Sequence, residues 1–140
     1  MKVLLATDGS KCARQAVRYL VRHRKEFGAR PEIHVLNVQQ PLPPRVAAAL
    51  GRSDVQRYHR EESLKALRPA KHTLDAKGVR YKPVCAIGDP GETIAEYAND
   101  GRFSLAIMGS HGRNALSSLL LGSAVRKVLA RSRVPVLIVR

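Results

Sequence analysis

Aromatic residues are scarce in this chain, which has four tyrosines, two phenylalanines and no tryptophan among 140 residues. Proteins that bind single-stranded nucleic acids stack successive bases on aromatic side chains. So few aromatic side chains supply such a platform poorly. The composition therefore disfavours a dedicated nucleic-acid-binding role.

Acidic residues are also few, 11 against 25 lysines and arginines, which gives a formal net charge of +14. A charge of this size suits nucleic acid, an anionic surface or simply a solvated basic exterior. The basic residues are spread over nearly every segment. Charge alone therefore does not choose among these partners.

Long apolar runs are absent as well. No stretch approaches the roughly 20 residues of a membrane-spanning helix, and the polar pair Thr7-Asp8 comes too early for a secretory signal. The two cysteines, Cys12 and Cys85, have no metal-ligand spacing, and they suit a reducing compartment. We expect a cytoplasmic protein with no disulfide and no membrane insertion.

What the chain does contain is a regular alternation of strand and helix patterns. With 44% apolar residues it can bury one core, so we expect a single domain over residues 1–140. The expected strands are Val3–Thr7, Ile33–Val38, Tyr81–Ile87, Ser104–Met108 and Val134–Val139. Strands joined by helices predict an α/β fold, in which a parallel sheet has helices on both faces.

The helical segments between these strands carry apolar residues at helical spacing. One face is formed by Ala13, Ala16, Val17, Leu20, Val21 and Phe27, and a later short helix contains Ile94, Ala95 and Ala98. The prolines at 41, 43 and 44 predict a loop. A helix from about residue 54 to 77 has Leu64, Leu67 and Leu74 as anchors, and Pro69 should kink or split it.

Glycines gather where the fourth strand ends. Gly109, Gly112, Gly122 and Ser123 form the pattern G-x2-G-x9-G-S directly after the apolar run. Glycine lets a ligand approach the main chain closely, so the first two glycines can turn N–H groups toward a phosphate. Ser123 is a good N-cap for a helix with apolar positions Val125, Val128 and Leu129, and the first turn of a helix attracts anions. The whole stretch is interpreted as a phosphate-binding loop.

The end of the first strand adds a carboxylate to the same edge. Thr7-Asp8 follows the first strand and Gly109 the fourth, and ligands of such sheets bind beside the carboxyl ends of strands. Asp8 can accept hydrogen bonds from ribose hydroxyls or help to hold a magnesium ion. Arg113 flanks the loop, and its guanidinium suits phosphate oxygens.

Catalytic patterns are weak by comparison. Cys12 and Arg18 match the C-x5-R spacing of phosphotyrosine phosphatases, but the residues between them read as helix. No G-x-x-x-x-G-K-[ST] motif is present. Nucleotide binding without efficient turnover is the simpler expectation, and no catalytic residue is assigned. A slow ATPase and a nucleotide-independent basic module for acidic partners or nucleic acid stay open as alternatives.

Several of these segments together resemble the universal stress protein family, in the branch whose members bind ATP. The resemblance rests on V-L-L-A-T-D-G-S at Val3–Ser10, G-D-P at Gly88–Pro90, I-M-G-S-H-G at Ile107–Gly112 and L-G-S at Leu121–Ser123. It implies a five-stranded sheet of order 3-2-1-4-5, the adenine nucleotide alpha hydrolase-like fold. It also implies homodimers paired through the last strand, Val134–Val139, and leaves protein partners unknown.

The resemblance assigns ATP, with magnesium where Asp8 helps to hold it, to the carboxyl edge of the sheet. The implied nucleotide-binding residues are Ala6, Thr7 and Asp8 by the ribose, Val38 by adenine through its main chain, Gly109, Gly112, Gly122 and Ser123 by the phosphates, and Met108 as a lining residue. Arg113 joins this set because its guanidinium suits phosphate oxygens. Two positions depart from the family pattern. Ser104 stands where the family usually has aspartate, and Asn37 stands where it has histidine.

Overall fold

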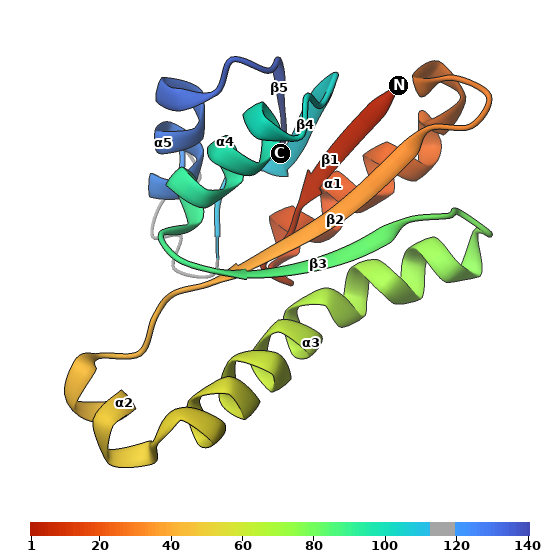
Figure 1. Cartoon of the computed structure of the whole chain (residues 1–140). Helices are drawn as coiled ribbons and strands as arrows, with labels where there is room; N and C mark the ends of the chain where they lie inside the picture. The colour runs from red at the N-terminus through yellow and green to blue at the C-terminus, as the bar shows by residue number, and fades with distance from the viewer. Residues whose placement is uncertain (113–119) are drawn as a thin grey trace.

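The computed structural model describes residues 1–112 and 120–140, which form an open parallel sheet with helices on both faces (Figure 1). The elements are β1 (Lys2–Ala6), α1 (Lys11–Arg22), the 3-10 helix η1 (Arg24–Phe27), β2 (Glu32–Gln39), α2 (Pro44–Leu50), α3 (Arg52–Ala76), β3 (Lys82–Ile87), α4 (Pro90–Asp100), β4 (Leu105–Gly109), α5 (Ser123–Arg131) and β5 (Val136–Val139). The strand order is β3-β2-β1-β4-β5, and neighbouring strands are parallel. The expected fold class and strand order are confirmed.

Along the central strand β1, apolar and polar residues do not alternate. Val3 lies opposite Ile33 on β2 and opposite Leu105 on β4, so β1 has a strand on each side. Val3 and Leu5 pack into the core on one face of the sheet, whereas Leu4 packs into the core on the other. Because both faces are covered, every position must be apolar.

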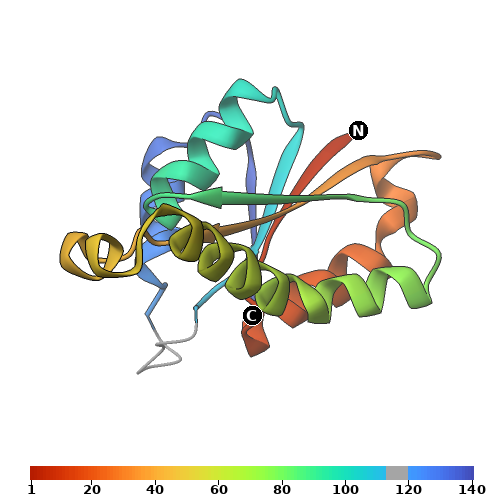
Figure 2. The same ribbon diagram turned by 60° about the horizontal axis from the view of Figure 1, so that its bottom comes forward.

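Two helical layers cover the sheet. In Figure 2, α1 and α3 lie on one face, and α4 and α5 lie on the other. The first layer packs over a core that includes Val17, Leu20 and Leu74, and the second over a core that includes Ile94 and Val128. In the part of the chain that is described, no helix has the length and apolar character needed to cross a membrane.

The two proline predictions hold only in part: Pro41 and Pro43 lie in the expected loop, but Pro44 does not. The chain is helical from Pro44, where α2 begins, because a proline at the first helical position loses no hydrogen bond. Pro69 lies inside α3 without splitting it. Packing of Leu67 and Leu74 into the core holds the helix together on both sides of the proline, and the Thr73 hydroxyl donates to the Pro69 carbonyl at 3.0 Å.

Three helix details also differ from expectation. Leu64 and Leu129 are 48% and 47% exposed, so neither is a core anchor. Leu64 falls beside the buried stripe of α3 rather than on it. α1 ends at Arg22, and Phe27 is buried from the separate helix η1, which ends at Gly28 with φ +105°. The burial of Phe27 was predicted from the pattern, but its membership of α1 was wrong.

Candidate functional site

The turn after β1 is built by short-range hydrogen bonds around Asp8. The Ser10 amide donates to Asp8 Oδ1 at 2.9 Å, and the Gly9 amide donates to Thr7 Oγ1 at 3.2 Å. Ser10 then caps α1, since its hydroxyl accepts from the Ala13 amide. Gly9 has φ +78°, and a Cβ there would lie 3.0 Å from the carbonyl oxygen of Ala66 on α3. Only glycine suits this close approach.

Asn37 ties this turn to the neighbouring strand. Its side chain is buried, and its Nδ2 donates to the Thr7 carbonyl at 2.8 Å. Its Oδ1 accepts from Gln39 Nε2 at 2.9 Å. The amide side chain therefore fixes the last backbone position before Asp8.

The glycines after β4 lie against the turn after β1. A Cβ on Gly109 would meet the backbone of Cys12 at 2.6 Å, so β4 can contact α1 only with glycine there. A Cβ on Gly112 would lie 2.9 Å from Asp8 Oδ2. The ends of β1 and β4 thus meet, as the sequence predicted.

The second half of the glycine pattern folds back onto the first. The Gly122 amide donates to the Ser110 carbonyl at 2.9 Å, and Ser110 is itself held by the Val139 carbonyl on β5. Gly122, not Ser123, is the N-cap of α5, so the predicted capping role of Ser123 is wrong. Ser123 is instead the first residue of the helix, where its amide has no intrahelical acceptor.

These segments enclose a pocket of about 240 Å³ at the carboxyl edge of the sheet. Nine of the ten residues predicted to bind nucleotide line it, namely Ala6, Thr7, Asp8, Val38, Met108, Gly109, Gly112, Gly122 and Ser123. The tenth, Arg113, lies outside the described residues. The structure therefore gathers the described members of the predicted set around one cavity.

Sequence reasoning missed the apolar walls of this pocket. The further lining residues are Ala13, Leu36, Pro90, Ile94, His111, Ala124 and Val125. Most of them were expected in the core or were not assigned. A helical pattern of apolar residues does not show which buried residues line a cavity. Pro90 had a signal in the Gly88–Pro90 motif, and the next residue, Gly91, lies against Ala124 and Lys127 of α5.

The pocket has an amide-rich end and an apolar end. Ser123, Ala124 and Val125 begin α5, and their N–H groups are among those that a helix leaves unpaired. Such amides at a helix start attract anions. The lining also includes Leu36, Val38 and Ile94, which suit a planar apolar group. No group of three or more metal-ligating side chains occurs among residues 1–112 and 120–140.

A carboxylate near the pocket joins the two helices that frame it. Asp89 caps α4 by accepting from the Glu92 amide at 3.0 Å, and its other oxygen accepts from Lys127 on α5. The Lys127 ammonium, followed by the Glu92 amide, lowers the pKa of Asp89 below its ordinary value. The charged carboxylate thus links the start of α4 to the middle of α5.

The fold and the pocket together define an open α/β protein with a ligand-sized cavity at the carboxyl ends of its strands. A family model described as "Universal stress protein family" matches residues 1–140. The universal stress protein YxiE of Bacillus subtilis is 32% identical over 147 residues, which cover 99% of this chain and 98% of that protein. This chain therefore belongs to the universal stress protein family.

Solved structures of the same fold support this assignment. The structure of the protein MJ0577 superposes with a TM-score of 0.81 at 28% identity, and the match covers 99% of this chain and 94% of that one. The Archaeoglobus fulgidus universal stress protein in complex with dAMP has a TM-score of 0.70 at 17% identity, covering 100% and 98%. An Arabidopsis thaliana family member with AMP bound has a TM-score of 0.69 at 16% identity, covering 99% and 90%.

Proposed function

We propose that this protein binds ATP in the pocket at the carboxyl edge of its sheet. The observation that carries the proposal is the meeting of Gly109, Gly112 and Gly122 with Asp8 and the first turn of α5 around one cavity. Two structures of this fold, described as complexes with dAMP and with AMP, add support for an adenine nucleotide. AMP and dAMP have one phosphate each, so the proposal of ATP adds two phosphates, and it does so on the glycine pattern of this chain.

In the proposed complex, the phosphates lie at the amide-rich end of the pocket. The glycines admit the phosphate oxygens close to the main chain, and the first amides of α5 donate to them. Adenine lies against the wall that includes Val38 and Ile94. Asp8 accepts from the ribose hydroxyls or shares a magnesium ion with the phosphates, and that ion supplies charge neutralisation. Arg113 is proposed as a further phosphate contact.

Titration calorimetry with Mg–ATP up to millimolar concentration tests the proposal, with Gly122→Val as the decisive variant. Gly122 has φ −61° and ψ 157°, a conformation that valine adopts readily, and a Cβ there would touch nothing closer than 3.4 Å. The added methyl groups enter the pocket and displace a phosphate from its amide donors. Losing one charge-assisted hydrogen bond costs about 1.5–3 kcal/mol, so the affinity should fall roughly 10- to 150-fold.

The control is Ala48→Val, which adds methyl groups on the exposed helix α2 and should leave the affinity unchanged. Thermal melts of both variants check that the fold survives. If the parent protein does not bind millimolar ATP, or if Gly122→Val binds as tightly as the parent, the proposed function is wrong.

A homodimer formed through Val134–Val139 is also proposed. β5 is the last strand of the sheet, pairs only with β4 among the described strands, and has four apolar residues that are all partly exposed. An apolar edge strand of this kind readily pairs with another chain. Sedimentation velocity at tens of micromolar protein should show the dimer mass, and a monomer under these conditions would contradict the proposal.

A cytoplasmic location is proposed on the thiol chemistry. Cys12 and Cys85 are both free, and Cys85 is exposed. Free thiols persist in reducing compartments. Immunoblotting of fractionated cells should find the protein with cytoplasmic markers, and recovery in another fraction would contradict this location.

A further inference from the structure

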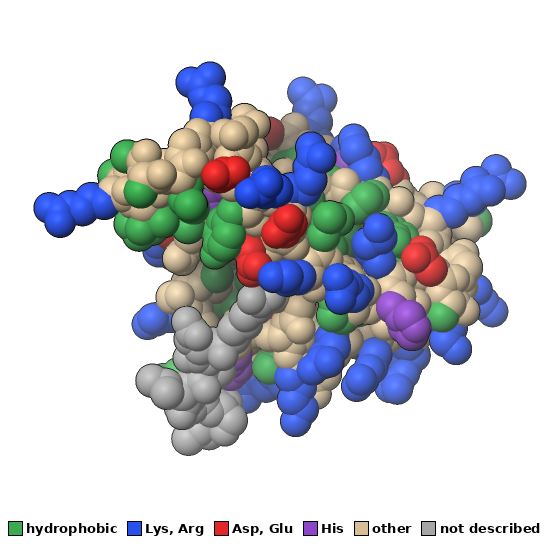
Figure 3. All heavy atoms as spheres, turned by 90° about the horizontal axis from the view of Figure 1, so that it is seen from below, with side chains coloured by type: hydrophobic (Ala, Val, Ile, Leu, Met, Phe, Trp, Pro, Cys, Tyr) green, Lys and Arg blue, Asp and Glu red, His purple; other side chains and the backbone are tan. Residues whose placement is uncertain are grey.

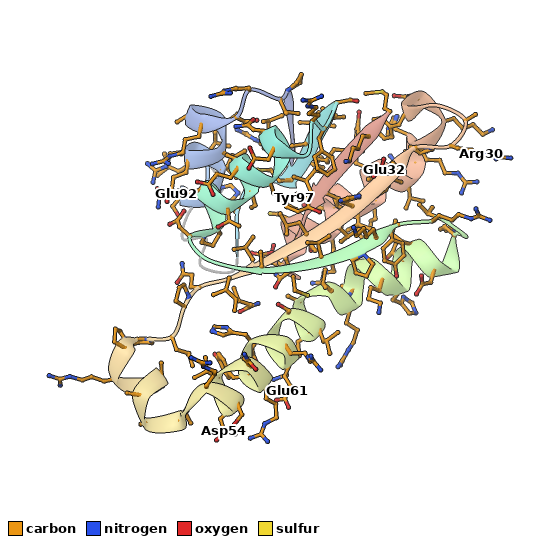
Figure 4. The ribbon with its side chains drawn as sticks, in the orientation of Figure 1. Arg30, Glu32, Asp54, Glu61, Glu92 and Tyr97 are labelled. Atoms are coloured by element: carbon orange, nitrogen blue, oxygen red, sulfur yellow. The ribbon has the colours of Figure 1, made fainter. Side chains whose placement is uncertain are left out.

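A second and larger cavity lies at the opposite edge of the sheet from the pocket described above. Its volume is about 610 Å³. It lies between the segment that leads from η1 into β2 and the turn that leads from α3 into β3, and its lining residues are Arg24, Lys25, Gly28, Ala29, Arg30, Pro31, Ile33, Gly78, Val79 and Arg80. Figure 4 labels Arg30 at this end of the molecule, far from α2. The cavity is separate from the proposed nucleotide site.

Four of the lining side chains are cations, and none is an acid. Arg24, Lys25, Arg30 and Arg80 all line the cavity, and all four are exposed. Among the described residues, none of the four forms an ion pair within 4.0 Å. Four uncompensated positive charges around one hollow repel one another. An anion in the cavity would relieve that repulsion.

The acids nearest in sequence are each engaged elsewhere. Glu26 lies 2.7 Å from His23, and Asp75 accepts from the Tyr81 hydroxyl at 2.9 Å. Glu32, labelled in Figure 4, accepts from the buried His34 ring at 3.0 Å and lies 3.6 Å from Lys2. None of these three carboxylates forms an ion pair within 4.0 Å with a described cation of the cavity.

Helix capping accounts for one of the four cations. Arg24 Nη1 donates to the Lys77 carbonyl at 3.0 Å, at the C-terminal end of α3, where a positive charge is favourable. No such hydrogen bond is formed by the side chains of Lys25, Arg30 or Arg80 in the described part of the chain. Three cations therefore exceed what the helix end requires.

The walls of the cavity are fixed by the fold. Ile33 and Val79 are buried and form an apolar floor. Two backbone hydrogen bonds hold the turn after α3. The Gly78 amide donates to the Asp75 carbonyl, and the Val79 amide donates to the Leu74 carbonyl. A site whose backbone is already ordered pays little entropy on binding.

We propose that this cavity binds a compact oligophosphate, either inorganic or carried on a small organic group. Guanidinium groups pair with phosphate oxygens in a planar fork, and the cavity is lined by three of them together with one ammonium. The volume lies within the range of roughly 300–1,000 Å³ that is usual for small-molecule sites. The apolar floor accommodates an organic group where one is present. A small polyanion, rather than a long one, matches a cavity of this volume.

Calorimetry with inorganic tripolyphosphate tests the site through a charge-matched pair of double variants. Arg30→Ala/Arg80→Ala removes two cations of the cavity and spares Arg24, which caps α3. The control, Arg45→Ala/Arg52→Ala, removes two exposed cations beside α2, so both proteins have the same net charge. We expect saturable binding of tripolyphosphate to the parent, at least a tenfold loss of affinity in the first variant, and less than a twofold loss in the control. Equal losses in both variants, or no saturable binding to the parent, would overturn the proposal.

The location of the bound anion is read from glycine amide resonances. Gly28 and Gly78 line this cavity, whereas Gly109 and Gly122 line the pocket at the carboxyl edge. In a sample labelled with ¹⁵N-glycine, tripolyphosphate should shift the resonances of Gly28 and Gly78. Shifts confined to Gly109 and Gly122 would overturn the proposal.

A second titration, with ATP, distinguishes the two sources of the oligophosphate. Shifts of Gly28 and Gly78 with both ligands mean that the cavity accepts an organic group, and shifts with tripolyphosphate alone mean that it takes the inorganic anion. Both results support the site. Failure of ATP to shift Gly109 and Gly122 would contradict the proposed nucleotide function and leave the tripolyphosphate result standing.

Discussion

Replacing Asn37 by alanine tests whether the turn before Asp8 depends on a single buried amide. The side chain is 1% exposed, and its hydrogen bond to the Thr7 carbonyl is 2.8 Å long. Alanine leaves that carbonyl without its donor in a site that water does not reach, at a cost of about 1–3 kcal/mol. The melting temperature of a chain of this size falls by about 2–4 °C per kcal/mol, so a decrease of roughly 2–12 °C is expected.

Two further variants give this experiment its controls. Asn37→Asp keeps the shape of the side chain, but the ionised carboxylate has no proton to donate to the Thr7 carbonyl and bears a buried charge. It should be less stable than Asn37→Ala at pH 7. The difference in stability between the two variants should be smaller at pH 4, because the protonated carboxyl group regains a donor. Gln39→Ala removes only the partly exposed donor to Asn37 and should cost less than about 1 kcal/mol.

Urea denaturation at pH 7 and pH 4 measures these differences, and calorimetry on the folded variants measures the affinity for ATP. Asn37→Ala should weaken ATP binding several-fold, because Thr7 and Asp8 lose their support. The hydrogen bond does not stabilise the fold if Asn37→Ala has the same urea midpoint as the parent protein. The same conclusion follows if Asn37→Asp is more stable than Asn37→Ala at pH 7.

Two remaining predictions concern the frame of the proposed nucleotide pocket. Gly109→Ala should destabilise the fold by roughly 1–3 kcal/mol, because its Cβ would lie 2.6 Å from the backbone of Cys12; a parental thermal melt would contradict this contact. The pKa of Asp89 is lowered in the folded state by Lys127, so its contribution to stability is present above the ordinary value of 3.8 and is lost as the pH falls through the lower folded value. Urea midpoints from pH 6 to pH 2 should therefore decline less for Asp89→Ala than for the parent, and parallel curves would show that Asp89 is not coupled to folding.

The central strands of the sheet could be predicted from the sequence because they are buried on both faces. The run from Val3 to Leu5 has no polar residue. Where a strand ends at the carboxyl-edge pocket, glycine or a polar pair stands at its end. Parallel packing followed from the alternation of elements, whereas the order of the strands came from the resemblance to a family. Strand order depends on which neighbours pair, and a single strand's composition does not record that.

The helices were harder to predict where packing opposed a local preference. Pro69 is unfavourable inside a helix, but α3 continues through it because residues on both sides bury apolar surface. Leu64 and Leu129 fit a helical period in the sequence, yet both are substantially exposed. A period identifies a face of a helix, and only the tertiary structure determines how wide the buried part of that face is.

One of the two cavities could be predicted from the sequence, and the other could not. At the carboxyl edge, each strand end bears its own signal, so Asp8, Gly109 and Gly122 could be assigned before their contacts were known. At the other edge, Arg30 and Arg80 are 50 positions apart in the chain, and each is an ordinary surface cation of a basic protein. Only the pairing of β2 with β3 brings the two loops together.

The distribution of charge connects the two edges of the sheet. α1 has four exposed cations and no acid, namely Lys11, Arg14, Arg18 and Arg22, and Figure 3 shows lysine and arginine side chains over much of the face seen from below. The field of such a surface draws small anions toward the molecule without selecting among them. Selection then depends on local donors, which are backbone amides beside Asp8 at one edge and guanidinium groups at the other. Guanidinium groups in solvent are screened by salt, whereas amides fixed at a helix start inside a pocket are screened less. The two proposed sites therefore differ in physical kind, and an excess of positive charge over the whole chain does not by itself account for either.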